Sequence, residues 1–357
     1  MSPTVNTNSS NIIDFVVKQG NGVKGLVDSG LEVVPKQYIQ PVEARFDASK
    51  VVPEESIPII DFTNWDDPDV AESITNAASK WGFFQIVNHG VPLKVIEDMK
   101  AVVHSFFELP VEEKRKYLKE NSPSETVVRL ATSFSSEAEA ILEWKDFVTL
   151  RYASEDEANT FWPPIIKNQA VEYMKKSEVV IKKLLGVLLK KLNVKEINKK
   201  LEYPLMGSMR LNLNYYPRCP NPEVAAGVGR HSDVSTITVL LQDEIGGLYV
   251  RGIENDTWVH VPPIDGALVI NIGDVLEIIS NGRYKSIEHQ VVANRNKSRI
   301  SIPIFVNPAS DAVIGPLPQV LENGEEAKYK QVVYSDYFEY FFSKAHDGKK
   351  TIDYAMI

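Results

Sequence analysis

RISIPIFV (299–306) closes a run of short β-branched segments that decides the fold of this chain. The segments before it are MRLNLNY (209–215), ITVLLQ (237–242), LYVR (248–251), WVHV (258–261), ALVINI (267–272) and KSIEHQVV (285–292). Turn signals such as Ile-Gly-Gly and Ser-Asn-Gly separate them, a spacing typical of a sandwich or jelly-roll barrel. No Gly-rich phosphate loop follows any of these segments, which argues against a dinucleotide-binding fold. The sequence therefore predicts a mainly β protein with a jelly-roll core.

Helical segments are expected around this β region. Apolar residues recur at helical spacing over 95–107, and an apolar stripe flanked by lysines runs through 169–195. A basic amphipathic helix can lie on a membrane surface, but covering a protein core is its commoner use. Further helices are expected at 70–80 and 332–350, strands at 56–62, 82–89 and 144–152, and irregular structure over the rest of 121–165.

These elements divide the chain into three parts. Residues 1–55 are expected to form an N-terminal arm, and residues 56–165 an N-terminal region of mixed helices and strands. Residues 166–357 are expected to hold the jelly-roll core, about 205–308, with a long helix before it and a C-terminal helix after it.

Composition excludes several classes of protein. The chain has 357 residues, of which 43% are apolar, so it can bury a large core and is not intrinsically disordered. Its single cysteine, Cys219, excludes internal disulfides and Cys-rich zinc modules. The net charge of −9 argues against binding to nucleic acid or to an anionic membrane surface. With no secretory leader or membrane span recognised, we expect a cytoplasmic protein.

Two of the six histidines and one carboxylate suggest metal chemistry. His231 and Asp233 are two residues apart in an extended segment, so their side chains can share a face, and His289 lies in a later strand-like run. Two imidazoles and one carboxylate form the facial ligand set of non-haem Fe(II) oxygenases. Such a pair with a distant third residue also arises by chance, and the same residues would serve a zinc hydrolase with a bound water.

A second pattern strengthens the first. Arg299 and Ser301 are two apart on a strand, so a guanidinium and a hydroxyl share one face. Arg has the planar fork that grips a carboxylate with two hydrogen bonds. An arginine inside a barrel beside Ile300 and Ile302 would be costly without an anionic partner, although strand alternation alone also allows a surface position. Asn214 and Tyr216 could add polar contacts or simply pack in a strand.

Together these motifs resemble the plant 2-oxoglutarate- and Fe(II)-dependent dioxygenases. The resemblance rests on Asn214-Tyr-Tyr216-Pro, His231-Ser-Asp233, His289 and Arg299-Ile-Ser301, in that order, and on SIPIIDF and KWGFFQIVNHGV in the N-terminal half. It covers roughly residues 40–345. GRHSDVSTITVLLQDEIGGLYVR, NIGDVLEIISNGRYKSIEH and KAHDGKKTIDYAMI are similar to the branch of feruloyl-CoA 6'-hydroxylases and p-coumaroyl-CoA 2'-hydroxylases.

The resemblance implies a double-stranded β-helix core and an oxidoreductase of phenylpropanoid metabolism. His231, Asp233 and His289 would be the catalytic metal ligands for Fe(II), and Arg299, Ser301, Tyr216 and Asn214 would bind the co-substrate 2-oxoglutarate. The hydroxylase would use O2, with ascorbate as reductant. It would hydroxylate p-coumaroyl-CoA, feruloyl-CoA or both at the ring carbon ortho to the propenoyl chain, leading to the coumarins umbelliferone and scopoletin. A monomer acting on an acyl-CoA is expected.

The resemblance also places Phe147, Thr149, Asn212 and Phe305 at the substrate pocket, although each phenylalanine could equally be a core residue. A CoA tail requires basic residues at the entrance, for which the candidates are Arg210, Arg218, Lys344, Lys349 and Lys350. His89, His104, His260 and His346 are interpreted as structural, and Cys219 as an unreactive thiol. The alternatives are a flavonoid or hormone dioxygenase and, more remotely, a zinc hydrolase or a non-catalytic ligand-binding protein.

Overall fold

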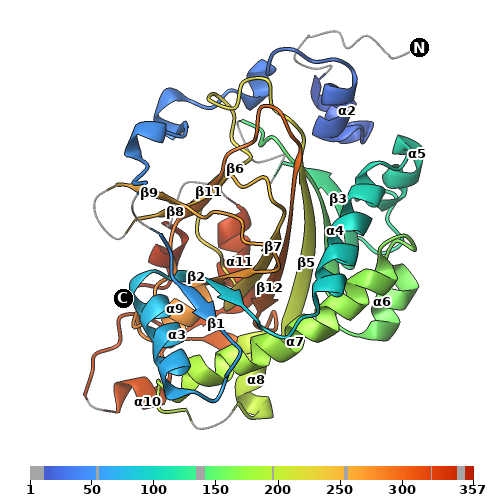
Figure 1. Ribbon diagram of the computed structural model, residues 1–357. Helices are drawn as coiled ribbons and strands as arrows, with labels where there is room; N and C mark the ends of the chain where they lie inside the picture. The colour runs from blue at the N-terminus through green and yellow to red at the C-terminus, as the bar shows by residue number, and fades with distance from the viewer. Residues whose placement is uncertain are drawn as a thin grey trace.

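The computed structural model describes residues 12–53, 56–133, 141–194, 197–252, 256–322, 324–343 and 350–357 (Figure 1). Its centre is a large twisted sheet with a smaller sheet beside it. Helices cover the outer face of the large sheet. The architecture is mainly β with flanking helices, as the sequence predicts.

The larger sheet has the strand order β1-β2-β10-β7-β12-β5-β4-β3 among the described residues. Its neighbouring strands are antiparallel except β1 and β2, which are parallel. The strands are β1 (Ile59–Asp61), β2 (Phe83–Val87), β3 (Val128–Thr132), β4 (Asp146–Tyr152), β5 (Ser208–Tyr216), β7 (Ile237–Gln242), β10 (Leu268–Ile272) and β12 (Arg299–Asn307). The pairs of β12 with β5 and β7 form the centre of this sheet.

The smaller sheet completes the jelly roll. Its strand order is β6-β11-β8-β9, all antiparallel. The strands are β6 (Val228–His231), β8 (Leu248–Arg251), β9 (Trp258–His260) and β11 (His289–Val291), and a separate ribbon pairs β13 (Val313–Ile314) with β14 (Val332–Val333). β11 is shorter than the predicted strand 285–292 because its ladder reaches only from His289 to Val291.

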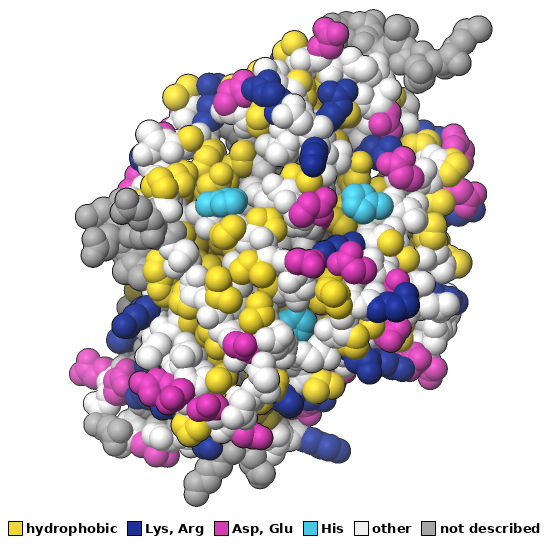
Figure 2. All heavy atoms as spheres, in the orientation of Figure 1, with side chains coloured by type: hydrophobic (Ala, Val, Ile, Leu, Met, Phe, Trp, Pro, Cys, Tyr) yellow, Lys and Arg dark blue, Asp and Glu magenta, His cyan; other side chains and the backbone are white. Residues whose placement is uncertain are grey.

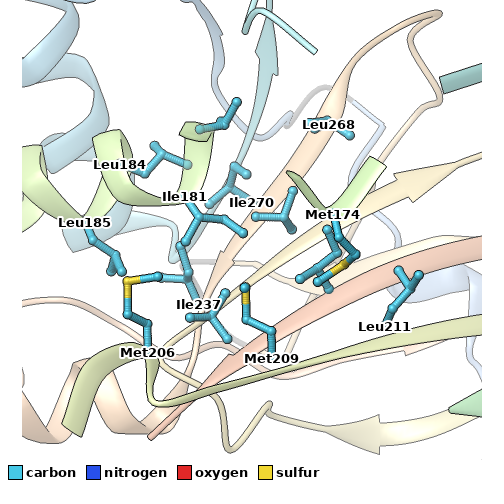
Figure 3. Packing of buried hydrophobic residues seen from close by; sticks show 14 of the residues in the cluster. Met174, Ile181, Leu184, Leu185, Met206, Met209, Leu211, Ile237, Leu268 and Ile270 are labelled. Carbon is cyan, nitrogen blue, oxygen red and sulfur yellow. The ribbon is translucent and has the colours of Figure 1, made fainter. Parts of the chain in front are cut away.

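The outer face of the large sheet carries the main core. The long helix α7 (Lys167–Lys190) lays its apolar stripe on the sheet, where Ile181, Leu184 and Leu185 are fully buried. Figure 3 shows these side chains packed against residues of β5, β7 and β10. The stripe is thus used for core burial and not for a membrane surface. In the described part of the chain no helix is long and apolar enough to cross a bilayer.

The other helices surround this layer. They are α2 (Gly22–Asp28), α3 (Pro68–Lys80), α4 (Leu93–Phe107), α5 (Val111–Lys114), α6 (Glu155–Phe161), α8 (Lys199–Met206), α9 (Asp274–Ile279), α10 (Pro318–Leu321) and α11 (Tyr334–Phe342). Short π and 3-10 turns are η1 (Asp14–Lys18), η2 (Lys36–Tyr38), η3 (Val42–Ala44), η4 (Ala48–Lys50), η5 (Arg115–Tyr117) and η6 (Lys350–Tyr354).

The described part of the N-terminal arm lies along one end of the molecule, blue at the top of Figure 1. Its residues Val16, Val23 and Leu26 pack in a cluster with Trp144 and Cys219. The carboxylate of Asp146 on β4 accepts hydrogen bonds from the backbone N–H groups of Val23 and Lys24, both at 2.8 Å. The first turn of α2 is therefore capped by a residue far along the chain.

β12 corrects one sequence interpretation. Its residues Ile300, Ile302 and Ile304 are fully buried, but they belong to the cluster under the helices. Arg299 and Ser301 point to the opposite face, which lines a cavity between the two sheets. The isoleucines therefore do not surround Arg299 inside the barrel, because alternate strand residues face opposite sides.

The sequence analysis does not predict several of the described elements, among them β3, α6 and α9. β3 and α6 lie in the stretch 121–165 that was expected to be mostly irregular, and α9 follows β10 directly. α6 has an N-terminal signal in Ser154, whose hydroxyl accepts the backbone N–H of Glu157 at 3.1 Å. The C-terminal helix is shorter than predicted, since α11 ends at Phe342 and residues 344–349 lie outside the described residues.

Candidate active site

His231, Asp233 and His289 meet at one point between the sheets. His231 ends β6 and is paired directly with His289 on β11, and Asp233 follows two residues after β6. The Nε2 atoms of His231 and His289 lie 3.5 and 3.7 Å from Oδ1 of Asp233. The potential ligand atoms of the three residues all lie within 4.8 Å of one another, and they form the one such group found in the described ranges. This donor set fits a single divalent metal ion.

Backbone contacts orient both imidazoles. Nδ1 of His231 lies 2.8 Å from the carbonyl oxygen of Gly229, and Nδ1 of His289 lies 3.2 Å from that of Ile287. A proton on Nδ1 satisfies each carbonyl and leaves the Nε2 lone pair free for a metal. Both rings therefore present the atom that the site requires.

Two residues that the sequence analysis does not predict form hydrogen bonds with the carboxylate of Asp233. Thr238 Oγ1 and Asn271 Nδ2 donate to Oδ2 of Asp233 at 2.6 and 2.8 Å. Oδ1 is thereby left to face the imidazoles. Thr238 and Asn271 are directly paired on β7 and β10, a relation that no local sequence motif contains.

The electrostatics of this group suit a cation. Burial by itself would raise the pKa of Asp233, but the two imidazoles and Thr238 hold this pKa well below its usual value. Burial, aided by His231, lowers the pKa of His289 to about 4. The site thus offers an ionised carboxylate and a neutral imidazole at neutral pH, which is the protonation that metal binding needs.

Arg299 lies beside this group in a buried, polar pocket. Its side chain is only 1% exposed, and its guanidinium sits 5.0 Å from the ring centre of Tyr216. Nη2 donates to Gln242 Oε1 at 3.3 Å, whereas Nε and Nη1 have no hydrogen-bond partner. A buried guanidinium with two unused donors is costly unless an anion binds to it.

The remaining predicted co-substrate residues surround Arg299. Ser301 Oγ accepts a hydrogen bond from Asn214 Nδ2 at 3.2 Å and lies 3.4 Å from the hydroxyl of Tyr216. β5 and β12 bring them together, because Arg299 is paired with Tyr216 and Ser301 with Asn214. The unused donors of Arg299 and these hydroxyls fit the distal carboxylate of 2-oxoglutarate.

A cavity of about 740 Å³ joins the two groups. It is lined by all the residues predicted for metal, co-substrate and substrate, including Phe147, Thr149, Asn212 and Phe305. Oδ1 of Asn212 is buried there without a hydrogen-bond partner. Aromatic walls with a few polar atoms suit an aromatic ligand that carries polar substituents.

Of the five basic residues predicted for the cavity entrance, the structure describes the side chains of Arg210 and Arg218. Arg210 lines the cavity, with its guanidinium 5.2 Å from the ring centre of Phe338 on α11. Arg218 does not line it. Lys344 and Lys349 lie outside the described residues, as does the side chain of Lys350.

The other histidines and the cysteine make local contacts. Nε2 of His89 lies 2.9 Å from the carbonyl oxygen of Gly266, and His260 packs on Tyr249. His104 is exposed on α4, and His346 lies outside the described residues. Burial raises the pKa of Cys219 to about 12, so its thiol remains protonated.

Two family models match the chain. Residues 207–308 match the model of the 2OG-Fe(II) oxygenase superfamily, and residues 57–169 match the model of the N-terminal region of non-haem dioxygenases in morphine synthesis. A feruloyl CoA ortho-hydroxylase from Ipomoea batatas is 60% identical over 98% of this chain and 97% of its own length. A bi-functional coumaroyl CoA and feruloyl CoA ortho-hydroxylase from Ruta graveolens is 57% identical over 97% of this chain and 95% of its own.

Solved structures agree with the fold. The crystal structure of JOX2 in complex with 2OG, Fe and JA matches with a TM-score of 0.82 and 34% identity, covering 94% of this chain and 97% of that one. The family supports Fe(II) and 2-oxoglutarate as the metal and co-substrate, and the donors described above fit both. The chain therefore belongs to the 2OG-Fe(II) oxygenase superfamily, as a 2-oxoglutarate-dependent dioxygenase of the feruloyl-CoA ortho-hydroxylase family.

Proposed function

We propose that this dioxygenase hydroxylates hydroxycinnamoyl-CoA thioesters, p-coumaroyl-CoA, feruloyl-CoA or both, at the ring carbon ortho to the propenoyl chain. The observation that carries the reaction type is the meeting of three metal-ligand residues with a buried arginine whose Nε and Nη1 are unpaired. The substrate class is supported by relatives of 56–60% identity, whose names specify feruloyl CoA or both thioesters. Ring closure of the products would lead to coumarins such as scopoletin and umbelliferone.

The residues have distinct tasks in this proposal. His231, Asp233 and His289 would hold Fe(II), and Arg299, Ser301 and Tyr216 would bind the distal carboxylate of 2-oxoglutarate, with Asn214 orienting Ser301. Together, bound Fe(II), 2-oxoglutarate and O2 supply the oxidising power, with succinate and carbon dioxide as by-products. The protein positions the reactants and excludes water from the metal.

The cavity would orient the aromatic substrate. Phe147 and Phe305 offer flat apolar surfaces for the ring, and they lie on strands on either side of β5. Thr149 and Asn212 are directly paired between these walls. The partnerless Oδ1 of Asn212 can accept the phenolic O–H of the substrate, an interaction that would select hydroxylated rings.

We further infer that the enzyme works as a cytoplasmic monomer without nucleic acid as a partner, with ascorbate keeping the iron reduced. The net charge of −9 supports the absence of nucleic acid. Light scattering of the purified protein and turnover with and without ascorbate test these two points.

The metal requirement separates this function from hydrolysis by zinc. The protein would be stripped with a chelator and reloaded with Fe(II) or Zn(II), and succinate formation would be measured. Fe(II) alone should restore succinate formation, because the oxidation requires a redox-active metal. Recovery with zinc alone would contradict an oxygenase, and metal-independent ligand binding without turnover would favour a binding protein.

A further inference from the structure

The cavity carries a positive charge that contrasts with the acidic protein. Six basic side chains line it against two carboxylates, Glu125 and Asp233: Lys119, Arg129, Lys145, Arg151, Arg210 and Arg299. The whole chain has a net charge of −9, and Figure 2 shows acidic and basic groups intermixed over one face. A local excess of cations at one cavity favours an anionic ligand there.

Four of these cations already have partners or assigned tasks. Lys145 pairs with Glu143 at 3.0 Å, and Arg151 pairs with Glu157. Arg210 stacks on Phe338, and Arg299 belongs to the 2-oxoglutarate pocket. Lys119 and Arg129 remain, both exposed, and neither makes an ion pair with another described residue.

Lys119 and Arg129 lie together at the outer edge of the cavity. Leu118 forms an isolated parallel bridge with Leu130, and these two residues turn toward the core. Arg129 is paired with Thr149 of β4, and both residues line the cavity. Lys119 stands in the turn directly after Leu118 and lines the same cavity. Glu125 lies at the same mouth, so the pair remains in excess by one positive charge.

The distance from the metal ligands matches the length of a CoA arm. Thr238, which contacts Asp233, lies on β7, and the sheet crosses β12, β5 and β4 before it reaches Arg129 on β3. Four strand spacings amount to roughly 19 Å. An extended pantetheine arm has about thirteen bonds from sulfur to phosphorus, the length of about four extended residues or roughly 14 Å. The propenoyl chain between ring and sulfur accounts for much of the remainder.

We propose that Lys119 and Arg129 form an anion subsite that binds phosphate groups of the CoA moiety while the hydroxycinnamoyl ring lies near the metal ligands. This inference rests on the proposed thioester substrate. The subsite would distinguish CoA thioesters from the free acids. It would also supply the local positive charge that a protein with a net charge of −9 needs to bind a polyanionic substrate. Arg129 lies on the edge strand β3, away from the strands that carry the residues assigned to iron and 2-oxoglutarate.

The test compares substrates that differ only in their phosphates. Feruloyl-CoA, feruloyl-dephospho-CoA and the feruloyl pantetheine thioester would be given to the wild type and to the double variant Lys119→Glu/Arg129→Glu. KM for feruloyl-CoA should rise about tenfold in the variant, the effect of losing about 1.4 kcal/mol from two exposed charge contacts. Its kcat and the KM for the pantetheine thioester should stay unchanged. The dephospho substrate shows whether the 3'-phosphate or the pyrophosphate is bound.

A matched control and a binding measurement complete the design. Lys297→Glu reverses an exposed charge that does not line the cavity, and it should leave every KM unchanged. Equal KM shifts for the CoA and pantetheine thioesters, or no shift for either, would overturn the subsite. Calorimetric binding of free coenzyme A to the Fe(II)- and 2-oxoglutarate-loaded protein tests the subsite without turnover. Loss of this binding in the double variant supports the subsite even if hydroxylation of thioesters fails, and equal binding contradicts it.

Discussion

Arg299 is the residue whose surroundings most clearly call for a ligand. It is buried on β12 beside Tyr216 and Ser301, and two of its donor nitrogens have no partner. In the proposed site these nitrogens bind a carboxylate that is not a metal ligand. Co-substrate binding and metal binding should therefore be separable by mutation.

We expect Arg299→Ala to raise the KM for 2-oxoglutarate by one to two orders of magnitude, since a buried charge-assisted contact contributes about 1.5–3 kcal/mol. The Kd for Fe(II), measured under anaerobic conditions, should change much less. Arg295→Ala, at an exposed position, is the control for loss of an arginine. An equal loss of iron and 2-oxoglutarate binding would indicate collapse of the barrel.

Asn271 is a positioning residue for Asp233. Its amide donates to Oδ2 of the carboxylate at 2.8 Å. Residues of this kind typically change metal affinity by about 10- to 100-fold when removed. We expect Asn271→Ala to weaken Fe(II) binding by about this amount, with a smaller effect on the KM for 2-oxoglutarate. Unchanged iron affinity together with a lowered melting temperature would show that Asn271 only packs.

The burial of His289 makes the stability of the metal-free protein depend on pH. Its pKa is lowered from 6.5 to about 4 in the folded state, so the unfolded chain binds more protons between these values. The contribution of His289 to the free energy of unfolding is thus fully present above pH 6.5, and it decreases as the pH falls toward 4. The melting temperature of the metal-free protein should fall across this window, and His289→Gln should reduce the slope. A slope that is equal in both proteins would contradict this assignment.

The residues of the site differ in how well the sequence predicts them. His231 and Asp233, and likewise Arg299 and Ser301, stand two residues apart on extended segments, so local alternation brings each pair to one face. His289 joins them through the pairing of β11 with β6. Thr238 and Asn271 contact Asp233 only because β7 pairs with β10. Arg129 reaches the cavity because β3 pairs with β4, and the isolated bridge between Leu118 and Leu130 brings the segment with Lys119 to the same strand. Contacts of this kind depend on strand order, which periodicity does not contain.

Among the elements, the start of α2 in the arm is held by one buried carboxylate. Asp146 on β4 accepts the backbone N–H groups of Val23 and Lys24 at the start of α2. Replacement by Ala leaves these donors without partners, and the loss of such a cap costs about 1–2 kcal/mol. We expect Asp146→Ala to lower the free energy of unfolding by this amount and to speed proteolysis within residues 12–53. Proteolysis at the wild-type rate would show that apolar packing alone holds the arm.

Elements with strong periodicity were predicted, and those that depend on tertiary pairing were not. α4 and α7 have continuous apolar stripes, and the structure places them at 93–107 and 167–190. β3 has only five residues with a charged arginine among them, and its pairing with β4 decides its conformation. α9 has only 6 residues, too few for a helical period to be recognised in the sequence.

At the scale of the whole molecule, the two sheets enclose a cavity, and different parts of its wall carry different kinds of side chain. The proposed metal ligands lie on the smaller sheet or just after it, whereas Arg299 and Ser301 lie on the larger sheet. Aromatic walls and basic residues extend from there across β5 and β4. One cavity can therefore hold a metal, a keto acid and an elongated anionic substrate at the same time. The division of the chain at residues 55 and 165 stays a prediction, for which limited proteolysis is the direct test.

Central to the proposed function is the hydroxylation of a hydroxycinnamoyl thioester by the enzyme in this cavity. The most direct test loads the enzyme anaerobically with Fe(II) and 2-oxoglutarate, adds feruloyl-CoA, p-coumaroyl-CoA, the two free acids or a flavonoid, and admits O2. Products would be identified by mass spectrometry over time. We expect one oxygen atom to be added to at least one thioester, ortho to its side chain, with one succinate formed per product. Turnover of a free acid or a flavonoid without any thioester product would contradict the claim.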